Sequence, residues 1–347
     1  MTILILHIEA SKMFKSKDKC NTVHKINKRR ISRTLSFVLM ISCIYFYACY
    51  VFMPKTNDSS YWYSSRGFRG EEKNSIDVLC LGSSGISCAV IPSVLYGQYG
   101  ISCSNASTFK TTMNNELGLY KESLDYQKPK VVILDTEIVW NGMTRTYKES
   151  PGAFYLTPFW NHSKIFTLKP NDLYLHTITN EDLFYNHLGC YTYLNSVASF
   201  DSWGINSDTQ LLYTISSDKD AEIKEFISTI LSNNVSILLL TTPEQYSRKY
   251  DSFHLCYHPY FVQLAKQYKN VSYLDFNDTE TNNTGIDANT DFYKIHHLNV
   301  TGAQKASAFL GEYLKSRYDL TDYRTVKSKN FKLESSLAYF NNLIGKK

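Results

Sequence analysis

Ile76-Asp77-Val78-Leu79-Cys80-Leu81-Gly82-Ser83-Ser84 is the stretch that decides the fold. Its apolar run is short and stops at Gly82, which is typical of a buried strand. A helix-like segment follows from Pro92. A serine on such a strand-to-helix turn lies at the carboxyl edge of a sheet, where its hydroxyl is exposed and backbone N–H groups can stabilise an anion. The same pattern also fits an ordinary serine-rich turn of an α/β protein.

Strand-like and helix-like segments alternate along the chain after this stretch. Lys130 to Asp135 (Lys-Val-Val-Ile-Leu-Asp) is the clearest buried strand, because it is β-branched or leucine up to its terminal acid. Alternation of this kind predicts parallel strands joined by right-handed crossovers. The fold class that we expect is therefore α/β, a three-layer α/β/α flavodoxin-like sandwich around a parallel sheet of about five strands, preceded by one N-terminal transmembrane helix. The other expected strands are 101–105, 235–241 and 271–276, and the expected helices are 92–99, 115–127, 218–232, 259–268 and 301–317, the last with Thr301 as its N-cap.

An uncharged apolar segment precedes the α/β region. Residues 34–53 contain no charged side chain, and a helix of that length spans roughly 30 Å, enough to cross a bilayer. The basic flank 25–33 lies on its N-terminal side. The positive-inside rule then predicts a single-pass protein of the cell membrane with a cytoplasmic N-terminus and an extracytoplasmic main domain. A cleaved signal peptide is the alternative, but no small-x-small cleavage site is evident.

The excess of positive charge lies at the N-terminus. The 347 residues include 37 Lys/Arg and 32 Asp/Glu, of which residues 1–33 hold nine and two, so the rest of the chain has 28 basic and 30 acidic residues. The main domain is about neutral, and its charge gives no support for nucleic-acid binding. The eight cysteines include no C-x-x-C pair, so no zinc site or thiol-redox site is predicted, and no metal or other cofactor is expected.

Changes in composition define the expected organisation of the chain. Residues 137–208 break the α/β rhythm with an irregular aromatic insert. This insert either forms a lid or acceptor-binding wall at the sheet edge or packs a small core of its own. The expected segments are a cytoplasmic basic tail (1–33), a transmembrane signal anchor (34–53), a juxtamembrane linker (54–74), the α/β domain (75–318) and a C-terminal tail (319–347).

A second block of sequence lies just before the last helix of this domain. It reads Thr290-Asp291-Phe292-Tyr293-Lys294-Ile295-His296-His297-Leu298-Asn299-Val300-Thr301-Gly302-Ala303. With the serine turn, it resembles the SGNH/GDSL hydrolase superfamily, and most closely its membrane-anchored bacterial branch. In that branch the first block reads roughly hydrophobic-Gly-Ser-Ser and the last reads Phe-Tyr-Asp-x-x-His-Leu-Asn-x-x-Gly-Ala. Residues 75–316 follow this layout.

The resemblance implies a serine ester hydrolase or acyltransferase with Ser84 as nucleophile and His297 as its base. The family's aspartate position, three residues before the histidine, is Lys294 here, so Asp291 is the candidate acid. Gly82 and Asn105 are the candidate substrate-binding residues. Asn105 fits a turn cap equally well, and His297 also fits a residue that caps the last helix.

Two functions remain open on the sequence alone. The first is an esterase or O-acyltransferase that acts on an ester-bearing cell-surface glycan or a small acyl ester. Acyl transfer across the membrane would need a multi-spanning acyltransferase as partner. The second is a catalytically degenerate protein that binds glycan or assists such a transferase, which Lys294 favours. A dinucleotide site is excluded, because the turn 82–87 lacks the G-x-G-x-x-G pattern. An enzyme needs Ser84 and His297 within hydrogen-bond reach, roughly 2.6–3.2 Å.

Overall fold

The computed structural model describes ten parts of the chain. These are residues 29–52, 65–107, 111–140, 168, 170–174, 215–245, 248–278, 283–294, 296–327 and 331–345. The chain divides into two compact units, one formed by Met1–Met53 with Tyr155–Leu175 and the other by Pro54–Phe154 with His176–Lys347. Most of the expected insert (141–167 and 175–208), the tail before residue 29 and residues 53–64 lie outside the described residues.

The larger unit is built on a five-stranded sheet in the order β2-β1-β3-β4-β5, with every neighbouring pair parallel. This order is the flavodoxin-like one, and it reverses direction between β1 and β3. The expected fold class is therefore confirmed. The strands are β1 (Val78–Leu81), β2 (Cys103–Asn105), β3 (Val131–Asp135), β4 (Ser236–Thr241) and β5 (Val271–Asp275).

Both faces of this sheet are buried, which explains why its strands read as continuous apolar runs. Alternate residues of each strand enter different cores, as the period of two requires. Leu79, Leu81, Val132 and Leu134 join one apolar cluster, and Val78, Cys80, Val131 and Ile133 join the other.

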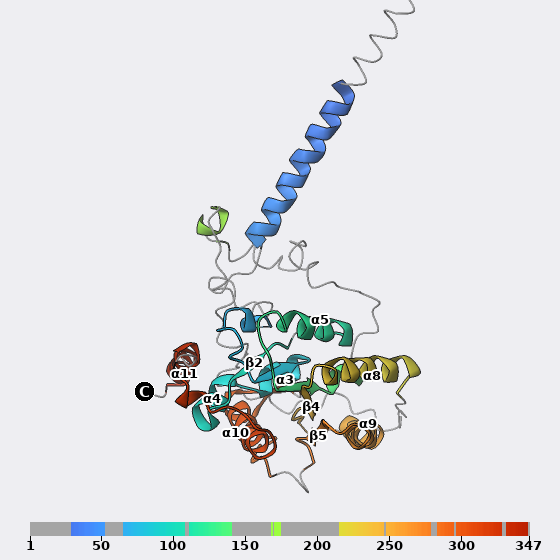
Figure 1. Cartoon of the computed structure of the whole chain (residues 1–347), viewed down its shortest axis with the longest axis vertical. Coiled ribbons are helices and arrows are strands. Elements are labelled where there is room, and N and C mark those ends of the chain that lie inside the picture. Colours follow the sequence, from blue (N-terminus) through green and yellow to red (C-terminus); the bar gives the residue numbers. More distant parts are fainter. Residues whose placement is uncertain are drawn as a thin grey trace, which may run out of the picture. The chain divides into compact units, whose positions relative to one another are not determined.

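Helices cover each face and complete three layers (Figure 1). On one face lie α5 (Met113–Ser123), α8 (Ser217–Leu231) and α9 (Arg248–Gln267), and on the other lie α3 (Ser84–Ala89), α4 (Pro92–Tyr99) and α10 (Val300–Arg317). Side-chain caps fix several of their first turns. Thr112 accepts a hydrogen bond from the backbone N–H of Asn115, and Ser216 accepts one from Lys219.

Three local details differ from expectation. Helix α9 begins at Arg248 and carries Pro259 inside it, not at its start. The N-cap of α10 is Asn299 and not Thr301, because the Asn299 side chain accepts from the N–H groups of Thr301 and Gly302. A short antiparallel hairpin, β6 (Phe292–Lys294) with β7 (His297–Leu298), precedes α10 and was not anticipated.

The domain begins earlier than the sequence indicated. The short helix η1 (Gly67–Arg69) contains Phe68, which is fully buried in the core that α5 and α8 share. Arg66 and Arg69 both form ion pairs with Glu122 on α5. The last part of the predicted linker, residues 65–74, is therefore packed structure.

The segment expected as a C-terminal tail also packs onto the larger unit. It contains η6 (Tyr323–Thr325) and α11 (Phe331–Leu343), and α11 contacts α4. Asp77, just before β1, accepts hydrogen bonds from the Thr321 N–H at 2.9 Å and the Tyr323 hydroxyl at 3.0 Å. On α4, the Tyr96 hydroxyl donates to Glu334 at 2.5 Å. These contacts join residues 321–334 to the start of β1 and to α4.

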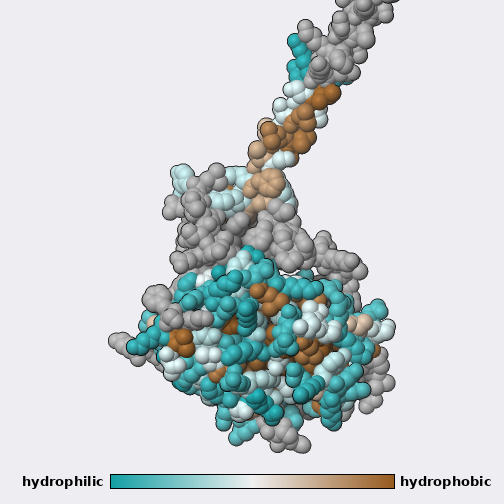
Figure 2. Space-filling model, viewed as in Figure 1, coloured by the Kyte–Doolittle hydropathy of each residue, from teal (hydrophilic) through white to brown (hydrophobic). Residues whose placement is uncertain are grey.

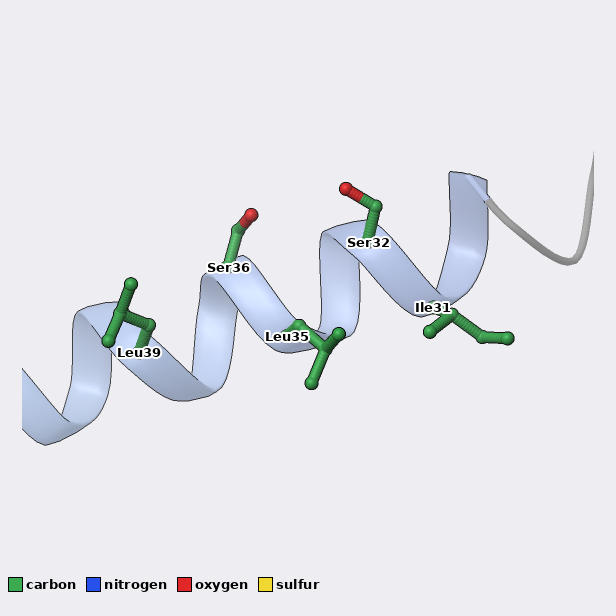
Figure 3. Close-up of a pocket in the computed structure, with 5 residues that line it drawn as sticks. All are labelled: Ile31, Ser32, Leu35, Ser36 and Leu39. Atoms are coloured by element: carbon green, nitrogen blue, oxygen red, sulfur yellow. The ribbon is translucent and has the colours of Figure 1, made fainter.

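The smaller unit is organised on one long helix, Arg29–Phe52. This helix of 24 residues is long and apolar enough to cross a membrane, and no other helix in the described parts of the chain is. Apolar residues are exposed along it, whereas the visible face of the larger unit is mostly hydrophilic (Figure 2). A shallow hollow on its surface is lined by Ile31, Ser32, Leu35, Ser36 and Leu39, none of which titrates (Figure 3). Near its other end, the Tyr47 hydroxyl donates to the carbonyl of Leu173 in η4 (Pro170–Leu173) at 2.7 Å.

Candidate active site

The serine turn places Ser84 at the first position of α3, directly beyond the carboxyl end of β1. Ser83 is the N-cap, and its hydroxyl accepts from the Gly85 N–H at 3.0 Å. Gly82 has φ +147°, and a Cβ there would lie 2.2 Å from the Cβ of Asp135 on β3. Only glycine allows this close approach, so the β1 turn lies against the end of β3. This is the point where the strand order reverses and where open α/β sheets bind ligands.

His297 meets Ser84 at this edge. Its Nε2 lies 2.9 Å from the Ser84 Oγ, although the two residues are 213 positions apart in the sequence. With Nε2 accepting the hydroxyl proton, the neutral imidazole carries its own proton on Nδ1. This contact has the geometry of a general base next to a nucleophile.

The hairpin that carries His297 is held by the start of α10. The Asn299 N–H donates to the Asp291 carbonyl at 2.9 Å, and its side-chain amide donates to the Thr290 carbonyl at 2.7 Å. Gly302 lies so close that a Cβ would be 2.3 Å from the Asp291 oxygen. The Asn-x-x-Gly pattern of the second block therefore fixes the strand β7 against the helix.

The surroundings of His297 favour the neutral base. Burial lowers the pKa of His297 below its ordinary value, and the charges of His296 and Lys294 lower it further, whereas the charge of Glu137 raises it. A base that stays neutral at physiological pH can accept the serine proton.

Asp291 does not take the place of the missing aspartate in this structure. Its buried carboxylate accepts from the Asp287 N–H and from the Lys305 Nζ, both at 2.7 Å. The loop 287–291 thus closes on itself and anchors α10. Lys294 pairs with His297 across the hairpin register, and its Nζ lies over the Tyr293 ring, 5.2 Å from the centroid.

The two predicted substrate-binding residues have their polar groups engaged within the fold. The Asn105 amide donates to the carbonyls of Ile86 and Val90, each at 3.0 Å, so both of its protons are used to hold α3. The Gly82 N–H donates to Glu116 Oε2 at 3.0 Å. Asn105 therefore fits the alternative role of a turn cap, and Gly82 allows the β1 turn to pack closely against Asp135.

Backbone N–H groups near Ser84 differ in whether they have an acceptor. The N–H groups of Gly82, Ser83 and Gly85 donate to Glu116, Asp135 and the Ser83 hydroxyl respectively. The Ser84 N–H has no acceptor among the residues that the structure describes. It lies at the start of α3, where helix N–H groups have no intrahelical partner.

Two acids beside the serine turn were missed by the sequence analysis. Asp135 ends β3, and Glu137 begins the short helix α6 (Glu137–Trp140). The Ser83 hydroxyl lies 2.6 Å from Asp135 Oδ2 and also contacts Glu137 Oε2. Complete burial, with the charge of Glu137, raises the pKa of Asp135 to about 7. The available signal was the Asp-x-Glu that begins at the last residue of the clearest buried strand.

Comparison with known proteins gives structural neighbours only. No family model matches the chain, and no curated protein matches it. A structure described as a lipolytic protein of the G-D-S-L family from Desulfitobacterium hafniense matches with 13% identity over 68% of this chain and 97% of its own, with a TM-score of 0.39. A family 3 carbohydrate esterase from Clostridium thermocellum matches with 12% identity over 70% and 96%, with a TM-score of 0.36. An acetylxylan esterase from Geobacillus stearothermophilus, in a mutant form, matches with 14% identity over 72% and 97%, with a TM-score of 0.36. Likenesses at these identities and TM-scores give no information on the chemistry of this chain.

Proposed function

We propose that this chain is a membrane-anchored serine esterase or O-acyltransferase that acts on an ester-bearing cell-surface glycan. The observation that carries the proposal is the 2.9 Å contact between His297 Nε2 and Ser84 Oγ at the β1/β3 edge. A hydroxyl is a weak nucleophile without an adjacent base, and this contact supplies one. The resemblance of both sequence blocks to the SGNH/GDSL superfamily supports the same assignment.

The reaction proceeds in two balanced steps. Ser84 Oγ attacks the ester carbonyl while its proton moves to His297 Nε2, and the Ser84 N–H donates to the oxyanion that forms. Collapse of this intermediate breaks the bond to the alcohol, which takes the proton from His297 and leaves an acyl-serine. Water, or an acceptor hydroxyl in a transferase, then attacks the acyl-serine with His297 again as base. This second attack restores free Ser84 and releases the acid or the new ester.

The location proposed for this activity follows from the N-terminal helix. Helix Arg29–Phe52 is long and apolar enough for a single-pass anchor. Its basic flank, residues 25–33, would remain in the cytoplasm, which puts the catalytic unit outside the membrane. A transferase of this topology would receive its acyl groups from a multi-spanning partner.

A catalytically degenerate binding protein is the second candidate. It is favoured by Asp291, whose carboxylate is held by Lys305 and the Asp287 N–H, and by Lys294 in the family's aspartate position. Loss of the acid of a triad lowers turnover by about 10⁴-fold in serine proteases.

The test uses the full chain in detergent with a short-chain aryl acetate. We expect steady release of the aryl alcohol and a transient acetyl adduct on Ser84, detected by intact-mass and peptide mass spectrometry. Ser84→Ala and His297→Ala should abolish both. Ser87→Ala is the matched control, because Ser87 lies on the same helix but contacts Ser107 at 2.5 Å, and it should keep full activity.

The two readouts separate the candidates. Acetylation of Ser84 without turnover indicates a transferase that lacks its acceptor. A folded wild-type protein with neither acetylation nor turnover would contradict the proposed catalysis and favour the binding protein.

A further inference from the structure

Glu137 contacts the serine turn beside the Ser84–His297 pair, and no role has been assigned to it above. Its Oε2 contacts the hydroxyl of Ser83, the residue directly before the nucleophile. The same oxygen lies 3.0 Å from the position that a Cβ of Gly85, the residue directly after the nucleophile, would occupy. Glu137 therefore lies close to the residue before Ser84 and to the residue after it.

Hydrogen-bond counting shows that this acid belongs to a proton-sharing cluster. The Ser83 hydroxyl has one proton, yet it lies within hydrogen-bond distance of two carboxyl oxygens, from Asp135 and Glu137. It can donate to only one of them. The second carboxyl then lies next to the hydroxyl oxygen without receiving its proton, which favours a neutral form of one of the two acids.

Burial decides which of the two acids is neutral. Asp135 is completely buried, and its pKa is raised to about 7. Glu137 is half-buried, at the start of α6. Because burial and the charge of Glu137 favour the neutral form of Asp135, the Ser83 hydroxyl proton is better placed on the contact with Glu137. The hydroxyl thus orients a negative charge next to the nucleophile.

We propose that Glu137 replaces the acid absent from position 294 and is the positioning residue that stabilises the charged form of His297. In the proposed reaction, its charge would favour the imidazolium that forms when His297 takes the Ser84 proton. The catalytic consequence rests on the proposed function. The coupling between the Glu137 and His297 charges does not depend on it.

The other charged groups near His297 act against this stabilisation. Lys294 on β6 and the neighbouring His296 both disfavour the imidazolium. His296 lies 3.3 Å from Glu244, and on α10 the nearest cation, Lys305, is paired with Asp291. Helix α3, which contacts β7, carries no charged side chain. Among the residues that the structure describes, Glu137 is the acid whose charge favours the imidazolium of His297.

The decisive test is the titration of His297 itself, which needs no enzymatic activity. The full chain in detergent is labelled with [13Cε1]-histidine, and the His297 signal is identified by its loss in His297→Gln. We expect Glu137→Gln to move the His297 midpoint to lower pH. Glu312→Gln, on α10 and not among the charges that act on His297, is the matched control and should leave the His297 midpoint in place. An unchanged or higher midpoint in folded Glu137→Gln would overturn the proposal.

A second measurement in the wild-type protein covers the case in which Glu137→Gln does not fold. Coupled groups sense each other's protonation. With [13Cδ]-glutamate labelling, the Glu137 carboxyl signal should therefore show a second step at the pH where His297 titrates. A Glu137 curve without that step would refute the coupling.

Kinetics then connect the coupling to the proposed reaction. Glu137→Gln should lower kcat of aryl acetate hydrolysis roughly 10-fold, with KM little changed, because a charge that helps only the developing imidazolium acts on the transition state. The acid limb of its pH profile should move to lower pH. If the wild-type protein shows neither turnover nor acetylation of Ser84 while the NMR coupling is present, the proposed function fails and the role of Glu137 as the charge partner of His297 stands.

Discussion

His258 and His297 both lie near the carboxyl ends of the sheet strands, but their ring nitrogens contact different groups. His258 on α9 contacts an acid, with its Nδ1 3.2 Å from Asp275 Oδ2 at the end of β5. His297 on β7 contacts a hydroxyl, with its Nε2 2.9 Å from Ser84 Oγ. The His–acid pair looks more like part of a triad, yet Asp275 also accepts from the Asn277 N–H at 2.9 Å, so it fastens a loop. A carboxylate on an imidazole is thus a poor marker of catalysis without the nucleophile.

The largest expected effect separates these two histidines. His297→Ala should lower aryl acetate hydrolysis by on the order of 10⁴-fold or more, because it removes the base of the proposed pair. His258→Ala should keep the activity within about threefold and lower the free energy of unfolding by about 1–2 kcal/mol, through loss of its hydrogen bond. Steady-state rates and denaturant unfolding of the full chain in detergent measure both. Equal losses of activity would remove the distinction between the two sites.

The next effect tests how tightly the β1 turn is packed against β3. Gly82→Ala should lower the free energy of unfolding by about 3–5 kcal/mol, since the new Cβ would overlap Asp135 and φ is positive. Gly285→Ala is the control, because φ there is also positive, at +67°, but no atom lies within 4 Å of the position that the new Cβ would occupy. It should cost only about 1 kcal/mol. Similar losses in the two variants would show that backbone conformation, and not the contact with Asp135, requires Gly82.

The third effect compares Asp135, beside the Ser84 turn, with Asp275, beside His258. Replacing each acid by asparagine should change the free energy of unfolding in opposite directions at pH 8. Burial raises the pKa of Asp135 to about 7 in the folded protein, so the native state holds a proton that the unfolded chain releases near its ordinary pKa of about 3.9. The stabilisation from this proton is present at low pH and is lost as the pH rises toward 7.

Asp135→Asn should therefore be more stable than the wild type at pH 8, by about 1–2 kcal/mol, and no more stable at pH 5. Asp275→Asn should be less stable at both values by about 1–3 kcal/mol, since it loses an ionised acceptor. Denaturant unfolding at the two pH values decides this. A loss of stability in Asp135→Asn at pH 8 would contradict a protonated, buried Asp135.

The smallest effect lies in the pH profile of the wild-type enzyme. Because burial lowers the pKa of His297, the base should still be more than about half neutral at pH 6.5, the ordinary value for histidine. The rate kcat/KM at pH 6.5 should then exceed half of its plateau. An acid limb centred above pH 6.5 would point to a different base, or to a net stabilisation of the imidazolium that outweighs burial.

Much of the fold could be predicted because its strands are buried on both faces. Short apolar runs such as Val78–Leu81 and Val131–Asp135 are typical of central parallel strands, and the structure places them there. The β6/β7 hairpin was missed because strands of three and two residues are too short to show a period of two. The cap of α10 was misplaced by two residues, since Asn299 and Thr301 are both good N-caps by type.

The site was predictable only where chemistry and local motif coincide. Ser84 and His297 each lie in a recognisable block, and the structure brings them together. Asn105 and Asp291 have suitable side chains, but the fold uses both for internal hydrogen bonds. Glu137 escaped notice because the Asp-x-Glu at the end of β3 marks an acid but not its partner, and the contact with Ser83 joins the ends of two strands far apart in the sequence.

The contacts of Asp77 with Thr321 and Tyr323 have a consequence for the order of events during synthesis. Thr321, Tyr323 and Glu334 follow their partners Asp77 and Tyr96 by 238 to 246 positions, so the ribosome makes them long after β1 and α4. Chains fold from their N-terminus only as far as their partners already exist. A message that stops near residue 318 would therefore leave Asp77 and Tyr96 without these partners, and the larger unit would stay incomplete.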